Sequence, residues 1–112
     1  MYVMIDNVRL QTLCEVEQGL QTRFNDAKCD ASGRLWAGTM GLQKADGSYT
    51  PSDGSLYTVS SSGESKTHLT DIGISNGLAW SHDNQTMFYI DSIPRKVYAF
   101  DYDIANGAIG EN

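Results

Sequence analysis

The chain of 112 residues is poor in basic residues, prolines and cysteines, with eight Lys and Arg, two Pro and two Cys. The basic residues are scattered and the net charge is −6, so no nucleic-acid partner is expected. No run approaches the roughly 18 apolar residues that a membrane-spanning helix needs. The start of the chain, Met1 to Ile5, has no basic region and is too short for a signal peptide. We therefore expect a cytoplasmic protein without a membrane partner.

The cysteines and histidines show no spacing that is typical of a metal site. Cys14 and Cys29 form no C-x-x-C motif, and two free thiols are favoured over a disulfide in a cytosolic protein. His68 and His82 are interpreted as surface residues. A G-x-S-x-G nucleophile motif is also missing, which argues against a serine hydrolase of that type.

The sequence does contain a regular series of short strand-like segments separated by turn residues, and none of helical period. This pattern predicts an all-β fold. Val8–Val16 is a less clear strand candidate at the start of the chain. The remaining predicted strands are Ala27–Asp30, Arg34–Met40, Ser55–Ser60, Lys66–Thr70, Leu78–Ser81, Thr86–Ser92, Lys96–Asp103 and Ala108–Gly110.

The two halves of this series repeat each other. Asn25 aligns with Asn76, Asp30 with Ser81, and Trp36 with the pair Phe88-Tyr89. A repeated four-stranded unit predicts blades of a β-propeller, and a β-sandwich remains the alternative. We expect residues 1–22 to end a preceding blade, residues 23–72 to form one blade and residues 73–112 to form the next. Because closed propellers have roughly four to eight blades, the chain is expected to be a fragment, a truncated isoform or a piece that assembles.

Polar residues stand where the first strand of each blade begins. The first strand is the innermost, so Asn25 and Asn76 are predicted to converge at the mouth of the central channel, with Arg23 and Asp26 beside them. An Asn carbonyl is a suitable ligand for a hard cation, and an arginine can hold a carboxylate or hydroxyl groups. The alternative is that Asn76-Gly77 is only a turn dipeptide and that Arg23 is a solvated loop residue.

Five motifs, in this order, carry a resemblance to a known family. The chain has R-F-N-D-x-K-x-D-x-x-G-R-x-x-A-G-T-M at 23–40, G-S-L-Y at 54–57, I-S-N-G-L-x-W-S at 74–81, Y-I-D-S at 89–92 and A-F-D-Y-D at 99–103. Over about residues 20–108 it resembles the regucalcin family, also called senescence marker protein 30, gluconolactonase or luciferin-regenerating-enzyme-like. The resemblance implies that the chain is about two blades, the middle third, of a six-bladed propeller.

The resemblance also implies a chemistry and a set of site residues. It implies a monomeric full-length protein that hydrolyses sugar lactones with a divalent cation, Ca²⁺, Zn²⁺, Mn²⁺ or Mg²⁺. By motif position, Asn76 matches a metal ligand, and Arg23 and Asn25 match substrate-contacting positions. Asp26, in the same motif, is a further candidate, as is Gln43, which stands where some members carry a substrate-contacting Glu. Two of the family's acidic metal ligands have no counterpart here: one near its N-terminus, and a base-like Asp expected beyond Asn112, so no catalytic residue is assigned.

Two readings other than an enzyme remain open at this point. The chain could belong to a non-catalytic, calcium-binding regulatory protein, or it could be an inactive truncated isoform. The lactonase reading expects the cation to polarise the lactone carbonyl while a carboxylate activates water. We expect the isolated chain to be inactive, because the cation site would be incomplete.

Overall fold

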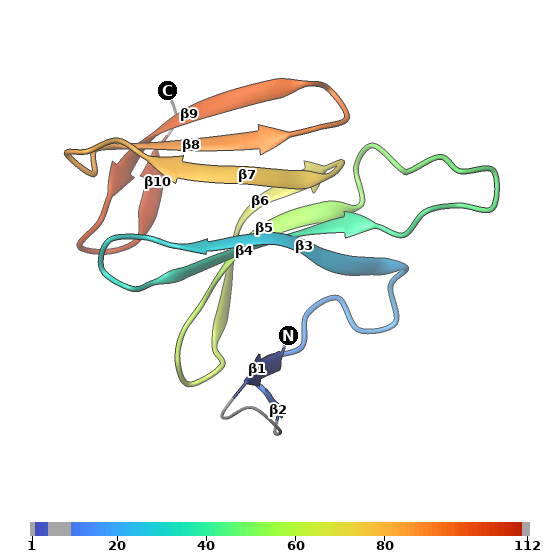
Figure 1. Cartoon of the computed structure of the whole chain (residues 1–112), viewed down its shortest axis with the longest axis horizontal. Helices are drawn as coiled ribbons and strands as arrows, with labels where there is room; N and C mark the ends of the chain where they lie inside the picture. The colour runs from blue at the N-terminus through green and yellow to red at the C-terminus, as the bar shows by residue number, and fades with distance from the viewer. Residues whose placement is uncertain (1, 5–9, 111–112) are drawn as a thin grey trace.

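The computed structural model describes residues 2–4 and 10–110, and within these residues the fold is all-β (Figure 1). Two four-stranded antiparallel sheets follow each other in the sequence, in the strand orders β3-β4-β5-β6 and β10-β9-β8-β7, and β1 pairs with β2 apart from them. The two sheets are blades of a propeller. The strands are β1 (Tyr2–Met4), β2 (Leu10–Thr12), β3 (Thr22–Cys29), β4 (Leu35–Gly41), β5 (Gly54–Val59), β6 (Ser65–Ile72), β7 (Ser75–Trp80), β8 (Thr86–Asp91), β9 (Lys96–Asp103) and β10 (Ala108–Gly110).

The predicted strand series is confirmed, but the first strand of each sheet starts earlier than predicted. Thr22 pairs with Gly41 and Ser75 pairs with Asp91, so the backbone ladder already exists before either asparagine. Asn25 and Asn76 therefore lie inside β3 and β7, where the register shifts, and not in front of the strands. The prediction was wrong because a bulge interrupts strand pairing without ending it.

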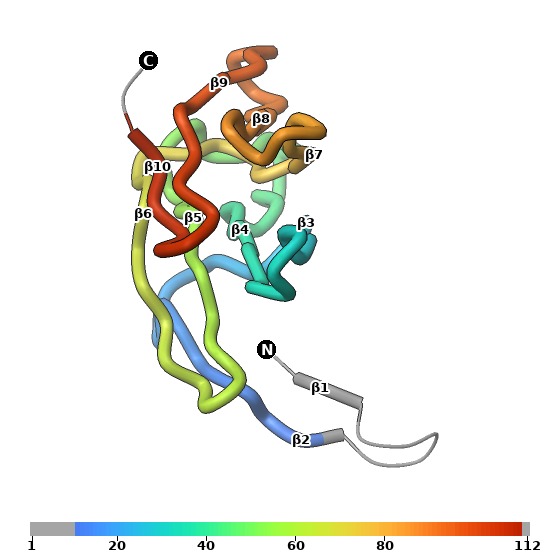
Figure 2. The backbone as a smooth tube through the Cα atoms, turned by 90° about the vertical axis from the view of Figure 1, so that its left-hand side faces the viewer, coloured from blue at the N-terminus to red at the C-terminus, as the bar shows by residue number. Residues whose placement is uncertain are grey.

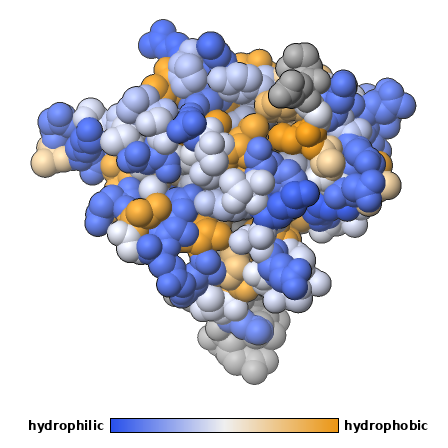
Figure 3. Space-filling model, turned by 180° about the vertical axis from the view of Figure 1, so that it is seen from behind, coloured by the Kyte–Doolittle hydropathy of each residue, from blue (hydrophilic) through white to orange (hydrophobic). Residues whose placement is uncertain are grey.

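The two sheets pack face to face around one apolar core. In β4 every residue after Leu35 is buried, as expected for a strand that is apolar on both faces. Figure 1 shows β7 lying along β3 and β4, and a single bridge between Met40 and Ile74 joins the sheets there. On the far side of this view, apolar patches interrupt a mainly hydrophilic surface (Figure 3). The buried cluster consists of Trp36, Leu56, Ile72, Leu78, Met87, Tyr89 and Tyr102.

The segment between β2 and β3 crosses the other face of the first sheet. Figure 2 shows it running beside β5 and β6. Glu17 Oε2 accepts hydrogen bonds from Thr39 Oγ1 at 2.9 Å and from Tyr57 Oη at 2.5 Å, and Cys14, in the same segment, is buried. Burial and the Glu17 carboxylate raise the pKa of Tyr57 to about 12. The predicted strand at 8–16 is wrong for residues 13–16, which form no strand, and its start at Val8 lies outside the described residues.

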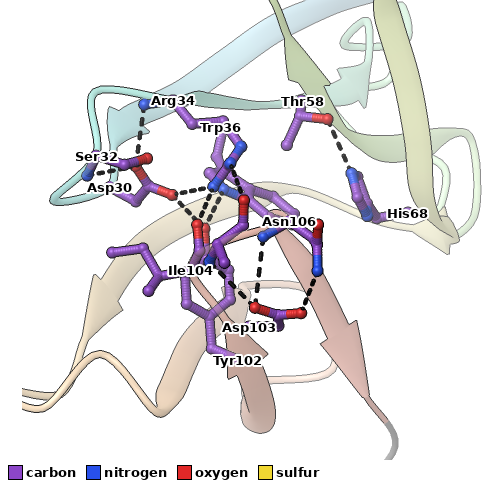
Figure 4. A network of polar contacts seen from close by, with 11 residues as sticks. Asp30, Ser32, Arg34, Trp36, Thr58, His68, Tyr102, Asp103, Ile104 and Asn106 are labelled. Carbon is purple, nitrogen blue, oxygen red and sulfur yellow. Dashed lines mark hydrogen bonds and ion pairs between the residues drawn. The ribbon is translucent and has the colours of Figure 1, made fainter.

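A polar network fastens the turn after β3 to the second sheet (Figure 4). The buried Asp30 carboxylate accepts hydrogen bonds from Ser32 and Tyr102 and forms an ion pair with Arg34 at 2.8 Å. Arg34 also donates to the carbonyl of Ile104 at 3.0 Å. Burial alone would raise the pKa of Asp30, but the hydrogen bonds from Ser32, Tyr102 and Arg34 outweigh it and hold the pKa below its usual value. We call Asp30, Ser32, Arg34 and Tyr102 the Asp30 latch.

The histidine prediction is half right. His82 is exposed, whereas His68 is half-buried with its ring 4.4 Å from the ring of Trp36, and its Nε2 lies 2.9 Å from Thr58 Oγ1. The sequence could not show this, because the two residues come from different strands. Cys14 and Cys29 are not joined by a disulfide. Nothing in the described residues forms a helix long and apolar enough to cross a membrane.

Candidate ligand-binding site at two strand bulges

The bulge of β7 is built on a glycine. The register of β7 shifts between Ser75 and Leu78, and Gly77, inside the shift, has φ of +86°. A side chain in this left-handed conformation would be strained, and a Cβ at Gly77 would lie only 2.7 Å from Ile90 Cδ1. The motif Ser75-Asn76-Gly77 therefore sets Asn76 next to a bend at which a residue other than glycine would be strained.

The bulge of β3 uses a carboxylate in place of a glycine. Its register shifts between Phe24 and Ala27, so Asn25 and Asp26 occupy the irregular positions. Asp26 Oδ1 accepts a hydrogen bond from the backbone N–H of Ala27 at 3.0 Å. Short polar side chains favour such local bonds to the backbone, which is why this sequence supports a bulge.

Two hydrogen bonds join the two bulges directly. Asn25 Nδ2 donates to the carbonyl of Ser75 at 2.8 Å, and the N–H of Gly77 donates to Asp26 Oδ2 at 2.7 Å. Positions that are 50 and 51 residues apart in the chain thus meet at one place. The predicted site residues Arg23, Asn25, Asp26 and Asn76 all lie on these two short segments.

Arg23 and Asn25 form a pair at the exposed side of β3. Arg23 Nη1 donates to the carbonyl of Phe24 at 3.0 Å and to Asn25 Oδ1 at 3.1 Å. The guanidinium is thereby held next to the bulge while its side chain remains exposed. An exposed guanidinium with a fixed orientation can bind a polar ligand through its remaining N–H groups.

Asn76 is exposed, and only its amide nitrogen is used within the described part of the chain. Its Nδ2 donates to Ser92 Oγ at 3.2 Å, and no hydrogen bond to Oδ1 is found among the described residues. A neutral carbonyl oxygen in this state fits one position of a hard cation, which takes six to eight oxygens. Residues 2–4 and 10–110 hold no group of three or more His, Cys, Asp or Glu that could complete the set. Asn76 therefore fits the role of one cation ligand, but the described residues do not supply a complete set of ligands.

Gln43 is not brought into this group by any described contact. It lies in the exposed loop after β4, and its Nε2 donates to the carbonyl of Gly47, in the same loop, at 3.0 Å. Its predicted substrate contact would require the side chain to leave this bond. The loop between β4 and β5 has no counterpart between β8 and β9, where the turn is short.

Ser75, which was not identified from the sequence, is bonded to residues of both sheets next to the bulges. Ser75 is fully buried; its Oγ donates to the carbonyl of Thr39 at 2.8 Å and accepts from Tyr89 Oη at 2.6 Å. Burial and the nearby charge of Asp91 raise the pKa of Tyr89, so it stays protonated. The only sequence signal was a serine directly before Asn76.

Asp91 has a supporting role. Its carboxylate accepts hydrogen bonds from the N–H groups of Gly73 at 2.9 Å and Ile74 at 3.0 Å, just before the β7 bulge. Asp91 is buried, with 2% of its surface exposed. It therefore fixes the backbone at the start of β7.

Comparisons with known proteins agree with this architecture. A family model described as the SMP-30/Gluconolactonase/LRE-like region matches residues 1–112. A protein of Sulfolobus acidocaldarius is 40% identical over 111 residues, which cover 98% of this chain and 38% of that protein. Regucalcin of Gallus gallus is 43% identical over 100 residues, which cover 88% of this chain and 33% of regucalcin. The chain therefore belongs to the SMP-30/Gluconolactonase/LRE-like family.

Two solved structures resemble the described fold. A luciferin-regenerating enzyme superposes with a TM-score of 0.83 at 38% identity, covering 93% of this chain and 34% of the enzyme. A calcium-binding protein, regucalcin, from Agrobacterium tumefaciens superposes with a TM-score of 0.79 at 28% identity. The chain spans about a third of the length of these relatives.

Proposed function

We propose that the chain forms part of a divalent-metal-dependent sugar lactonase of the gluconolactonase type. In this proposal residues 1–22 end a preceding blade of a six-bladed propeller, and residues 23–72 and 73–112 form two further blades. The observation that carries it is the meeting of the two bulges, which groups a paired arginine, two asparagines and a carboxylate at the first strands of neighbouring sheets.

Each residue of the group has a distinct role in the proposal. Asn76 supplies one neutral oxygen to the cation, which when bound would polarise the lactone carbonyl. Arg23 and Asn25 hold the polar groups of the sugar lactone, and Gln43 adds an uncharged contact once it leaves Gly47. The general base and the anionic metal ligands would come from outside the described residues.

A second function is favoured by one specific finding. The solved relative from Agrobacterium tumefaciens is described as a calcium-binding protein. A protein that binds Ca²⁺ at Asn76 without turning over a lactone would serve as a calcium-binding regulator. Turnover is the property that separates the two functions, because both require the cation.

A chimera tests the lactonase proposal. Residues 1–112 replace the matching third of Danio rerio regucalcin, to which the chain is 38% identical over 111 residues. The host regucalcin is assayed first with gluconolactone and Zn²⁺, Mn²⁺ or Ca²⁺, and the chimera is then assayed in the same way. We expect turnover by the chimera and none by the 112-residue chain alone, since the chain lacks most cation ligands. A folded chimera that binds the ion but leaves the lactone intact contradicts the lactonase and supports the calcium-binding function.

Two substitutions in the chimera separate the proposed roles. Arg23→Ala should lower kcat/KM with little change in cation affinity, because a guanidinium cannot ligate a cation. Asn76→Ala should weaken cation binding in a chimera that remains folded. Equal loss of cation binding in both variants, measured by calorimetry, would contradict the assignment of Arg23 to the substrate.

A further inference from the structure

We infer that Asp26 is a positioning residue for Asn76: its carboxylate holds the β7 bulge in place and binds neither the cation nor the substrate. This inference rests on the proposed function, because it takes Asn76 as the cation ligand. It changes the interpretation of Asp26, which the sequence alone made a candidate for substrate contact.

Both carboxylate oxygens of Asp26 are bonded to backbone. Oδ1 accepts from the N–H of Ala27 at 3.0 Å within its own bulge, and Oδ2 accepts from the N–H of Gly77 at 2.7 Å in the facing bulge. Asp26 is partly buried, whereas Asn25 and Asn76 on either side of the contact are exposed. A charged acceptor makes a stronger hydrogen bond than a neutral one, so Asp26 is well suited to hold a backbone donor.

The residues on both sides of Asn76 are held from β3. Gly77 is bonded to Asp26, and the carbonyl of Ser75 accepts from Asn25 Nδ2 at 2.8 Å. Ser75 is further anchored through its hydroxyl group to Tyr89. The backbone of Asn76 is thus fixed at its two neighbours, and its side chain is braced by Ser92 Oγ at 3.2 Å.

The alignment of the two bulges explains why the holding residue is an aspartate. Counting from the register shifts, Asn25 corresponds to Asn76 and Asp26 corresponds to Gly77. The first sheet therefore carries the acceptor side chain of Asp26 at the position where the second sheet carries Gly77. Gly77 has no side chain, and its N–H is the donor. Gly77 is conformationally permissive, so without Asp26 its φ of +86° would be weakly fixed and the oxygen of Asn76 would lose its orientation.

The first test measures, in the ¹⁵N-labelled 112-residue chain, whether Asp26 stabilises the hydrogen bond of the Gly77 amide. Asp26→Ala should speed hydrogen exchange of the Gly77 amide by about tenfold and broaden the side-chain NH₂ signals of Asn76. Asp26→Asn, which keeps the size, should give a smaller change in the same direction and serves if the alanine variant does not fold. Asp101→Ala is the matched control, since it removes an exposed carboxylate from β9. Unchanged Gly77 exchange and Asn76 signals in a folded Asp26 variant would overturn the inference.

The second test asks whether Asp26 acts through Asn76, using Mn²⁺ as the probe. Because the chain alone lacks most cation ligands, dissociation constants are measured by paramagnetic relaxation in the Danio rerio chimera, for the unchanged chimera, Asp26→Ala, Asn76→Ala and the double variant. We expect each single variant to weaken Mn²⁺ binding several-fold and the double variant to be no weaker than Asn76→Ala. Losses that add up would show that Asp26 ligates the ion directly and would overturn the inference. If the host regucalcin binds Mn²⁺ but the chimera does not, while the Gly77 and Asn76 signals of the chain change in Asp26→Ala, the result would contradict Asn76 as a cation ligand, and with it the proposed function. The contact from Gly77 to Asp26 would still stand.

Discussion

The two sheets have the same strand connections but differ in what covers them. The first sheet has the second sheet against one face and the segment 13–18 against the other, so Trp36 and Tyr57 are both buried. The second sheet buries Met87 and Tyr89 against the first sheet, while Phe88 on its other face remains 39% exposed. Burial in this fold therefore depends less on strand sequence than on which segment the chain places over each face.

Aligned positions make the difference measurable. Trp36 pairs with Lys28 as Phe88 pairs with Ala79, so Trp36 and Phe88 occupy equivalent places in the two sheets. Trp36 is fully buried and donates through Nε1 to Tyr102 Oη at 3.0 Å. The open face of the second sheet is defined by the side chains of Phe88, Ile90 and Val97, which are 39%, 38% and 66% exposed.

The largest expected effect is at this pair of equivalent positions. Trp36→Ala should lower the free energy of unfolding by about 3–5 kcal/mol, because it leaves a cavity in the core and removes the N–H group that donates to Tyr102 Oη. Phe88→Ala should cost less than about 1.5 kcal/mol, since much of its surface is already in water. Urea unfolding of the two variants measures both values. Similar losses would show that the open face is covered in solution, for example by self-association.

The second effect concerns the Asp30 latch, for which the described residues of the second sheet show no counterpart. The hydroxyl group of Ser81, at the position equivalent to Asp30, forms hydrogen bonds within its own turn: it donates to Asp83 at 2.6 Å and accepts from the N–H of Thr86 at 3.1 Å. Asp30→Asn should cost about 2 kcal/mol, because it weakens a buried ion pair, and Ser81→Ala should cost less than about 1 kcal/mol.

The Asp30 latch also predicts how the free energy of unfolding changes with pH. The pKa of Asp30 is lower in the folded chain than its ordinary value, so its contribution to stability is present above that ordinary value. The contribution is lost as the pH falls through the folded pKa. Urea unfolding between pH 6 and pH 3 should show a decline that is shallower in Asp30→Asn. An identical decline in both proteins would mean that Asp30 does not govern acid sensitivity.

A third, smaller effect separates the two histidines. Burial, together with repulsion from Lys66 and Arg34, lowers the pKa of His68 to about 4. Between this value and the ordinary one near 6.5 the unfolded chain binds more protons than the folded chain, so stability falls as the pH is lowered through that range. After allowance for partial exposure, the loss should be of the order of 1 kcal/mol. Thermal unfolding at pH 7 and pH 5 should show it in the wild-type chain and not in His68→Gln. His82→Gln, in an exposed turn, should show the same loss of stability as the wild type. If the loss disappears in His82→Gln and persists in His68→Gln, His68 is not its cause.

The smallest effect on stability is expected at the open face. Val97→Lys should change the free energy of unfolding by less than about 0.5 kcal/mol, because the side chain is already in water. It should nevertheless reduce self-association, since a charge interrupts the exposed apolar surface. Analytical ultracentrifugation over a range of concentrations measures this. Thr67→Lys places the same charge on an exposed position of β6 and serves as the control, and equal effects of the two changes would show that net charge alone is responsible.

The sequence by itself determined the strands, the repeat and the family. Strand positions follow from short apolar segments and from turn residues close to them in the chain, such as those around Gly33 and Asn84, whose φ values are +87° and +59°. The motif from Arg23 to Met40 identified the family and the candidate residues before any spatial arrangement was known.

Only the tertiary structure decided how those residues are used. The bulges that contain Asn25 and Asn76, the burial of Ser75 and the bond from Gly77 to Asp26 depend on two sheets meeting, with partners up to 51 residues apart. The contact of His68 with Trp36 and the hydrogen bond between Glu17 and Tyr57 likewise depend on segments that are distant in the sequence coming together. A local pattern carries the preference of a segment for a strand, but a hydrogen bond between sheets exists only when packing has fixed the distance between its donor and its acceptor.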